Sequence, residues 1–158
     1  MQDRLKKVLA EPWSRRLLTD LEALDRASRP PRRCACRCEV SDAVAEVNVL
    51  VTAGLARSAA VLYAFGCRPH AFPGAHHAMT GLLLFEAMLG QALVFEGTVQ
   101  ELAVCLGRLR RGTMTEEGVG AWLAARSRSR GAVERPLLAA VRGRRRRAPR
   151  AIARVAAG

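Results

Sequence analysis

The sequence predicts an all-α protein, a single-domain helical bundle with a central apolar helical hairpin. Half of the 158 residues are hydrophobic but only 4% are aromatic, so the core must come mainly from Leu, Ala and Val. Ala, Leu and Arg favour helices, whereas residue types that favour strands, such as Ile, Thr and Tyr, are scarce. No stretch alternates apolar and polar residues as a half-buried strand does. The length suits one domain of ordinary size.

Two helices are predicted at the start of the chain, over residues 2–10 and 12–27. Pro12 suits the first turn of a helix, where its missing N–H has no consequence. A stripe with the three- and four-residue spacing of a helix face follows, formed by Leu17, Leu18, Leu21 and Leu24. The pair Pro30-Pro31 ends this pattern, and we expect an exposed loop over residues 28–42.

Two strongly apolar segments, residues 44–66 and 81–95, predict the central hairpin. We expect one helix over about 42–65, capped by Gly66, because glycine adopts the left-handed conformation that ends many helices. Residues 67–80, which contain prolines and adjacent histidines, form the predicted connector. A helix that is apolar on nearly all sides belongs in the middle of a core.

Neither apolar segment has the composition of a membrane span. A spanning helix needs about 20 predominantly apolar residues, and an ionisable side chain at its centre is costly. Glu46 and Arg57 interrupt the first segment. The second is short and contains Glu86 and Gln91. We therefore expect no permanent membrane span.

Two capping boxes predict the last helices of the bundle. The pairs Thr98–Glu101 and Thr113–Glu116 each place a glutamate three residues after a threonine. In this arrangement the threonine oxygen accepts the backbone N–H of the glutamate, whose side chain reaches back to the N–H of the threonine. We expect one helix over 99–109 and another from the second box to about Arg128.

Basic residues are concentrated at the end of the chain. Residues 1–100 hold 12 basic and 10 acidic side chains, a net charge of +2, whereas residues 101–158 hold 14 and 4, a net charge of +10. We predict a helical bundle over 1–130 and a basic, arginine-rich tail over 131–158.

The arginine-rich tail makes a basic, nucleic-acid-associated protein the alternative function class, because guanidinium groups bind phosphates. The arginines that would contact nucleic acid are Arg144, Arg145, Arg146, Arg147 and Arg150. The tail contains no aromatic residue for base stacking and no Asn or Gln for base readout. A solvated basic tail without a ligand is the other interpretation.

Three closely spaced cysteines, Cys34, Cys36 and Cys38, are the most metal-like feature of the sequence. Their Cys-x-Cys spacing differs from the Cys-x2-Cys spacing of common zinc sites, so we expect an exposed loop that holds no metal. The side chains that could complete a thiolate and imidazole site are Cys67, His70, His76 and His77.

The adjacent histidines His76 and His77 could serve in acid–base chemistry, because histidine titrates near neutral pH. No Asp or Glu lies nearby in the sequence to orient either ring. The chain also contains no H-E-x-x-H, G-x-S-x-G or phosphate-loop motif. We expect a protein that is not an enzyme and uses no cofactor.

The opening residues are charged throughout and contain no apolar run, so no signal peptide is predicted. Three of the five cysteines lie too close together for ordinary disulfide geometry among themselves. These features indicate an intracellular protein, cytoplasmic by default, and the arginine run could also act as a nuclear address. Whether the chain forms a homodimer is left open.

One stretch resembles the Bcl-type apoptosis regulators, including their divergent viral members. In that family a valine-and-glutamate start leads to an Asn-Trp-Gly-Arg signature and then to an alanine- and phenylalanine-rich helix ending in Phe-Gly. Here Val44-Ala-Glu-Val47 leads to Gly54-Leu-Ala-Arg57, and Ser58-Ala-Ala-Val-Leu-Tyr-Ala-Phe-Gly66 follows. Of the signature itself, only the arginine is kept. Residues 116–125, with a Gly and a Trp, are similar to the family's later Gly-Trp motif.

The resemblance implies a non-enzymatic protein that captures an amphipathic helix of a pro-apoptotic or signalling partner in a hydrophobic groove. It would restrain cell death, in association with mitochondria. The resemblance places Arg57 at the groove edge, paired with an aspartate of the partner. The groove walls would be Val47, Leu50, Val51, Leu55, Val61 and Leu62. The other interpretation of Arg57 is that its guanidinium reaches water from a helix edge.

Overall fold

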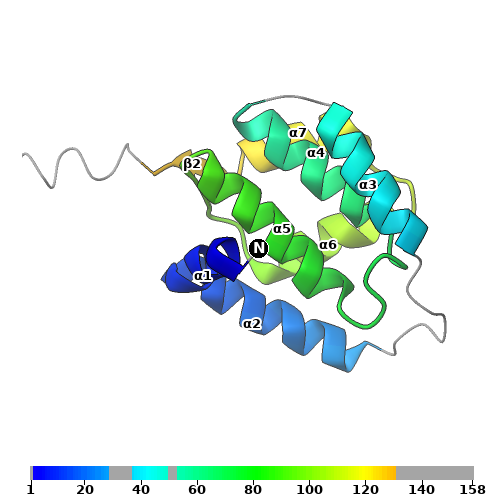
Figure 1. The fold of residues 1–158 in the computed structure, drawn as a ribbon, viewed down its shortest axis with the longest axis horizontal. Helices are drawn as coiled ribbons and strands as arrows, with labels where there is room; N and C mark the ends of the chain where they lie inside the picture. Colours follow the sequence, from blue (N-terminus) through cyan, green and yellow to red (C-terminus); the bar gives the residue numbers. More distant parts are fainter. Residues whose placement is uncertain (1, 29–36, 50–52, 131–158) are drawn as a thin grey trace, which may run out of the picture. The chain divides into compact units, whose positions relative to one another are not determined.

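The chain folds mainly into helices. The computed structural model describes residues 2–28, 37–49 and 53–130, which form seven α-helices and one two-stranded sheet (Figure 1). The predicted all-α class is therefore confirmed. The predicted basic tail, residues 131–158, lies outside the described residues, and its boundary at residue 130 stays a prediction.

The first two helices have the predicted bounds: α1 spans Gln2–Ala10 and α2 spans Pro12–Ala27. Pro12 occupies the first turn of α2, as expected from its fixed backbone and missing N–H. The side chains of α2 that face the core recur every three or four residues, and they are Ser14, Leu18, Leu21 and Asp25. One of them is a carboxylate, whose partners lie at the start of another helix.

The central hairpin consists of α4, Leu55–Gly66, and α5, His76–Gly90. The backbone N–H of Gly54 donates to Oε1 of Gln91 at 2.7 Å, so the start of α4 lies beside the end of α5 and the two helices run antiparallel. In Figure 1, α5 crosses the middle of the bundle with α2 on one side and α4 on the other. The predicted central apolar hairpin is confirmed.

The remaining helices pack around this hairpin. They are α3, Arg37–Val49; α6, Val99–Arg110; and α7, Glu116–Ala124. All three contact α4, while α1 and α2 contact α5. The apolar character of α4 on nearly every side follows from this arrangement, because four helices surround it.

The prediction of one helix over about 42–65 is wrong. α3 ends at Val49, and α4 begins only after Gly54, whose φ of 66° is left-handed and incompatible with a continuous helix. The predicted exposed loop over 28–42 is also wrong in part, because α3 already begins at Arg37. The rest of that loop, residues 29–36, lies outside the described residues.

The second apolar segment also departs from its prediction. α5 begins at His76, so the connector is shorter than the predicted 67–80. After α5 the chain forms a short strand, β1, Leu93–Phe95, which pairs with β2, Ser127–Ser129. Each strand has three residues, too few to show alternation in a sequence. β2 also lies where the last predicted helix was expected to continue.

Gly66 is the last residue of α4 and not a left-handed cap, so the predicted role of this glycine is wrong. A Cβ atom at this position would lie 2.6 Å from Cδ1 of Leu109 in α6. The missing side chain therefore lets the end of α4 approach α6 closely.

The capping box that opens α6 is confirmed. The Thr98 hydroxyl accepts the backbone N–H of Glu101 at 3.2 Å, and the Glu101 carboxylate accepts the N–H of Thr98 at 2.8 Å. The second predicted box is wrong, because Thr115 rather than Thr113 caps α7 by accepting the N–H of Gly118.

Buried apolar side chains form two separate clusters. The main core draws on every helix except α3, of which only the side chains of residues 39–47 are described. The principal members of the main core are Val8, Leu21, Leu62, Leu84, Phe85, Met88, Leu102, Leu106, Leu109, Val119 and Leu123. The second cluster joins α3 to α4 and consists of Ala43, Val47, Val61, Ala64 and Phe65. We call it the α3 cluster. None of the described helices is long and apolar enough to cross a bilayer.

Candidate functional site

One side of α4 carries a row of residues with the spacing of a helix face. Arg57, Val61, Ala64, Phe65 and Arg68 share one side of the helix and of the turn that follows it. We call this row the α4 stripe. It has a guanidinium at each end and an apolar middle. At a rise of 1.5 Å per residue, the two arginines stand ~16 Å apart along the helix axis.

α3 covers the apolar middle of the α4 stripe (Figure 1). Ala43 of α3 is fully buried and Val47 is only 7% exposed. Phe72, Leu83 and Ala87 pack alongside the cluster. Burying one alanine and one valine side chain contributes about 2–3 kcal/mol. The apolar contribution that holds α3 on α4 is therefore small.

Arg68 adds a polar contact between α3 and the end of α4. Its Nη2 lies 2.6 Å from Oε2 of Glu46 in α3, and its Nη1 donates to the carbonyl of Ala64 at 2.6 Å. The two ionic side chains are 26% and 31% exposed, so water only partly screens the pair. The Arg68 guanidinium thus donates a hydrogen bond to a carbonyl at the end of α4 and forms an ion pair with a carboxylate of α3.

The predicted groove residues occupy different environments. Arg57 is half-buried and makes no hydrogen bond or ion pair with any other described residue. Leu55 is half-buried against the main core, and Leu62 is fully buried within it. Val47 and Val61 face each other in the α3 cluster, so an incoming helix would reach them only after α3 moved. The predicted wall residues Leu50 and Val51 lie outside the described residues.

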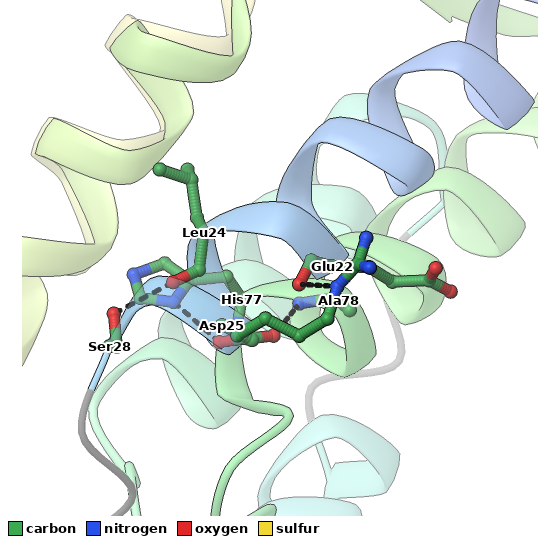
Figure 2. Close-up of polar contacts among 7 residues, drawn as sticks. Glu22, Leu24, Asp25, Ser28, His77 and Ala78 are labelled. Carbon is green, nitrogen blue, oxygen red and sulfur yellow. Dashed lines mark hydrogen bonds and ion pairs between the residues drawn. The ribbon is translucent and has the colours of Figure 1, made fainter.

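A second polar cluster ties α2 to the start of α5 (Figure 2). The buried carboxylate of Asp25 accepts the backbone N–H of His77 at 3.1 Å and that of Ala78 at 2.8 Å. Oδ1 of Asp25 also lies 2.7 Å from Nδ1 of His77. No side chain caps α5 from its own N-cap residue, so Asp25 supplies this cap from another helix.

His76, the first residue of α5, is 8% exposed, and neither ring nitrogen has a hydrogen-bond partner among the described residues. Burial, helped by the neighbouring charges of His77 and Arg110, lowers the pKa of His76 from 6.5 to about 4. The charge of Asp25 opposes this shift without reversing it. The ring is therefore neutral at physiological pH.

The Asp25–His77 pair has the form of an acid–base dyad, in which a carboxylate orients an imidazole. Figure 2 draws one side-chain hydroxyl, that of Ser28 after the end of α2, and it donates to the carbonyl of Leu24. Both carboxylate oxygens of Asp25 accept backbone N–H groups of α5. The geometry therefore supports a structural tie between two helices.

The cysteine-rich stretch lies largely beyond what the structure describes: Cys34 and Cys36 fall in 29–36, and Cys38 lies in the first turn of α3. No group of His, Cys, Asp or Glu in the described part of the chain could hold a metal ion. Burial raises the pKa of the thiols of Cys67 and Cys105, the latter to about 11, so both stay protonated near neutral pH.

Sequence reasoning missed two residues of these sites. Asp25 falls on the buried stripe of α2 together with Leu18 and Leu21, and a carboxylate on such a stripe signals a buried partner. Arg68 gave no comparable signal, because its partner Glu46 is 22 residues away and on another helix. The tail arginines proposed for nucleic acid lie outside the described residues.

No protein-family model, curated protein or solved structure matches this chain.

Proposed function

We propose that this protein binds an amphipathic helix of a partner protein on the α4 stripe, in the place that α3 occupies. The observation that carries the proposal is the separation of the two clusters. Every other helix contributes side chains to the main core, whereas none of the described side chains of α3, those of residues 39–47, belongs to it. Removing α3 from α4 would therefore leave the main core intact.

The chemistry of the α4 stripe fits a helical ligand. Helix-in-groove recognition uses apolar anchors at helical spacing together with polar contacts that fix orientation. Val61 and Phe65 offer an apolar surface one turn long, and Arg57 and Arg68 offer a guanidinium at each end. A partner that buries a larger apolar side chain than Val47 against the α4 stripe would gain more than the about 2–3 kcal/mol that α3 gains there.

The finer form of the proposal follows from the resemblance to Bcl-type regulators. The partner would be the amphipathic helix of a pro-apoptotic or signalling protein, and its capture would inhibit cell death. Arg57 lies at one end of the α4 stripe and lacks a partner within the described residues, so it is available to an aspartate of that helix.

Calorimetric titration of the full chain with a panel of amphipathic peptides, death-motif peptides among them, tests the proposal. We expect binding of at least one peptide, weakened about tenfold by Arg57→Ala, since a charge-assisted pair is lost. The matched control is Arg16→Ala, which removes an exposed arginine from α2 and should leave binding unchanged. A panel in which no peptide binds would contradict the proposal.

A further inference from the structure

We infer that Arg68 selects the partner, and that the partner helix carries an acidic side chain on its buried face beside a small residue, as α3 does with Glu46 and Ala43. This inference rests on the proposed function and extends it. Arg68 lies outside the Bcl-like stretch of residues 44–66. The chemistry expected of the ligand is that of α3, the helix that occupies the α4 stripe in this structure.

The requirement for an acidic side chain on the partner helix follows from the position of Arg68. Its guanidinium is about three-quarters buried, and one nitrogen is held by the carbonyl of Ala64. When α3 leaves, the Glu46 carboxylate leaves with it. A neutral or basic ligand would then cover a guanidinium that has lost its counter-charge, and this penalty disfavours such ligands. A ligand with a carboxylate at the same place restores the pair.

The requirement for a small residue on the partner helix follows from the packing around Ala43. This side chain is fully buried among Val61, Ala64 and Phe65. The Phe65 ring stacks on that of Phe72, with centroids 5.7 Å apart and planes 20° apart. This stacking restrains the Phe65 ring, which therefore limits the size of the side chain that packs against it. A ligand helix that approaches as closely as α3 needs alanine, glycine or serine at this position.

The spacing of the two arginines sets the length of the ligand. At a helical rise of 1.5 Å per residue, the step from Arg57 in α4 to Arg68 in the turn after it corresponds to ~16 Å, a length that about eleven helical residues span. A ligand helix of three turns or more can therefore reach both guanidinium groups, with one acidic side chain near each end. The inferred partner is an acidic amphipathic helix with a small residue in its centre.

The test uses the full chain with Ala43→Leu, a change that is too large for the α3 cluster and loosens α3 from α4. The probe is a synthetic peptide of residues 37–49 with serine in place of Cys38. We expect calorimetry to show binding that Arg68→Glu weakens about tenfold or more and Arg68→Gln weakens less. A second peptide with Glu46→Lys should bind the Arg68→Glu chain better than the native-sequence peptide does.

The outcomes separate the two proposals. In one outcome, the native-sequence peptide binds the Arg68→Gln and Arg68→Glu chains as tightly as it binds the chain that keeps Arg68. That result would show that Arg68 does not select the ligand and would overturn the inference, whereas the proposal of helix binding would stand. If the peptide binds none of these chains, the α4 stripe does not accept a helix in trans and both proposals fail. Circular dichroism identifies any variant that fails to fold, and Arg16→Glu serves as the matched control for a charge reversal elsewhere.

Discussion

The carboxylate of Asp25 holds the backbone and the ring of His77, although 52 positions separate the two residues in the chain. This contact fixes the end of α2 against the start of α5 and caps α5 with a full negative charge, where the helix dipole favours one. Because the carboxylate is buried, its hydrogen bonds have no water to replace them.

Asp25→Ala should lower the free energy of unfolding by about 2 kcal/mol, because it leaves the part-buried N–H groups of His77 and Ala78 without their acceptor. Urea unfolding followed by circular dichroism measures the change. Asp20→Ala removes an exposed carboxylate from the same helix and should change the stability by less than about 0.5 kcal/mol. Equal effects of the two substitutions would show that Asp25 does not act as a cap.

The stability should fall as the pH falls from about 6.5 to about 4, because of His76. Burial holds the pKa of His76 at about 4 in the folded protein, whereas an unfolded histidine titrates near 6.5. Between these values the unfolded chain binds a proton that the folded chain excludes, so protonation favours unfolding. The full loss of stability is about 3 kcal/mol, and almost all of it occurs below pH 6.5.

His76→Leu should remove this component of the pH dependence, since leucine does not titrate and needs no hydrogen-bond partner at this buried position. The groups that face His76, namely His77, Asp25 and Arg110, stay in place in this variant. Unfolding in urea at pH 7 and at pH 4.5 compares the two chains. A wild-type chain and a variant that lose the same stability on acidification would contradict the assignment to His76.

Gly81 allows α5 to lie close to α2. A Cβ atom there would stand 2.4 Å from Cδ1 of Leu21, a fully buried side chain of the main core that would have to shift. Gly81→Ala should therefore destabilise the protein by about 1–3 kcal/mol. Gly90→Ala, at the end of the same helix, meets no atom within 4 Å and should be neutral or slightly stabilising. Thermal unfolding distinguishes the two.

α3 should detach without unfolding the rest of the chain. Ala43→Leu overfills the α3 cluster, so the backbone amides of α3 should exchange with solvent at least about tenfold faster, while those of α2 and α6 keep their protection. Ala45→Leu places the same side chain on the exposed side of α3 and should leave exchange unchanged. Faster exchange throughout the main core in Ala43→Leu would show that α3 is an integral part of it.

Local signals in the sequence accounted for the two N-terminal helices and for the start of α6. The spacing of Leu18 and Leu21, the position of Pro12, and the pair Thr98–Glu101 each fix a helix through neighbouring residues alone. The break between α3 and α4 was missed because the apolar pattern continues across it. Gly54 and its positive φ mark the break, but a glycine within an apolar run also fits a continuous helix.

The candidate sites were harder to predict, because they depend on contacts between helices. Arg57 was predicted from a family resemblance and its role stays a prediction, whereas Arg68 acquires its contact only when α3 brings Glu46 to the end of α4. His77 was noted as a titratable residue without a carboxylate nearby. The carboxylate that orients it comes from α2, and only the packing of α2 against α5 around the core brings it there.

The most direct measurement of helix binding is amide hydrogen exchange of the full Ala43→Leu chain, with and without a saturating concentration of the peptide of residues 37–49. If a helix binds on the α4 stripe in place of α3, exchange slows in α4 and at the start of the connector around Arg68, and the chain's own α3 stays rapidly exchanging. If the peptide slows exchange only in other helices, or leaves α4 unchanged at saturation, this protein does not bind helices on the α4 stripe.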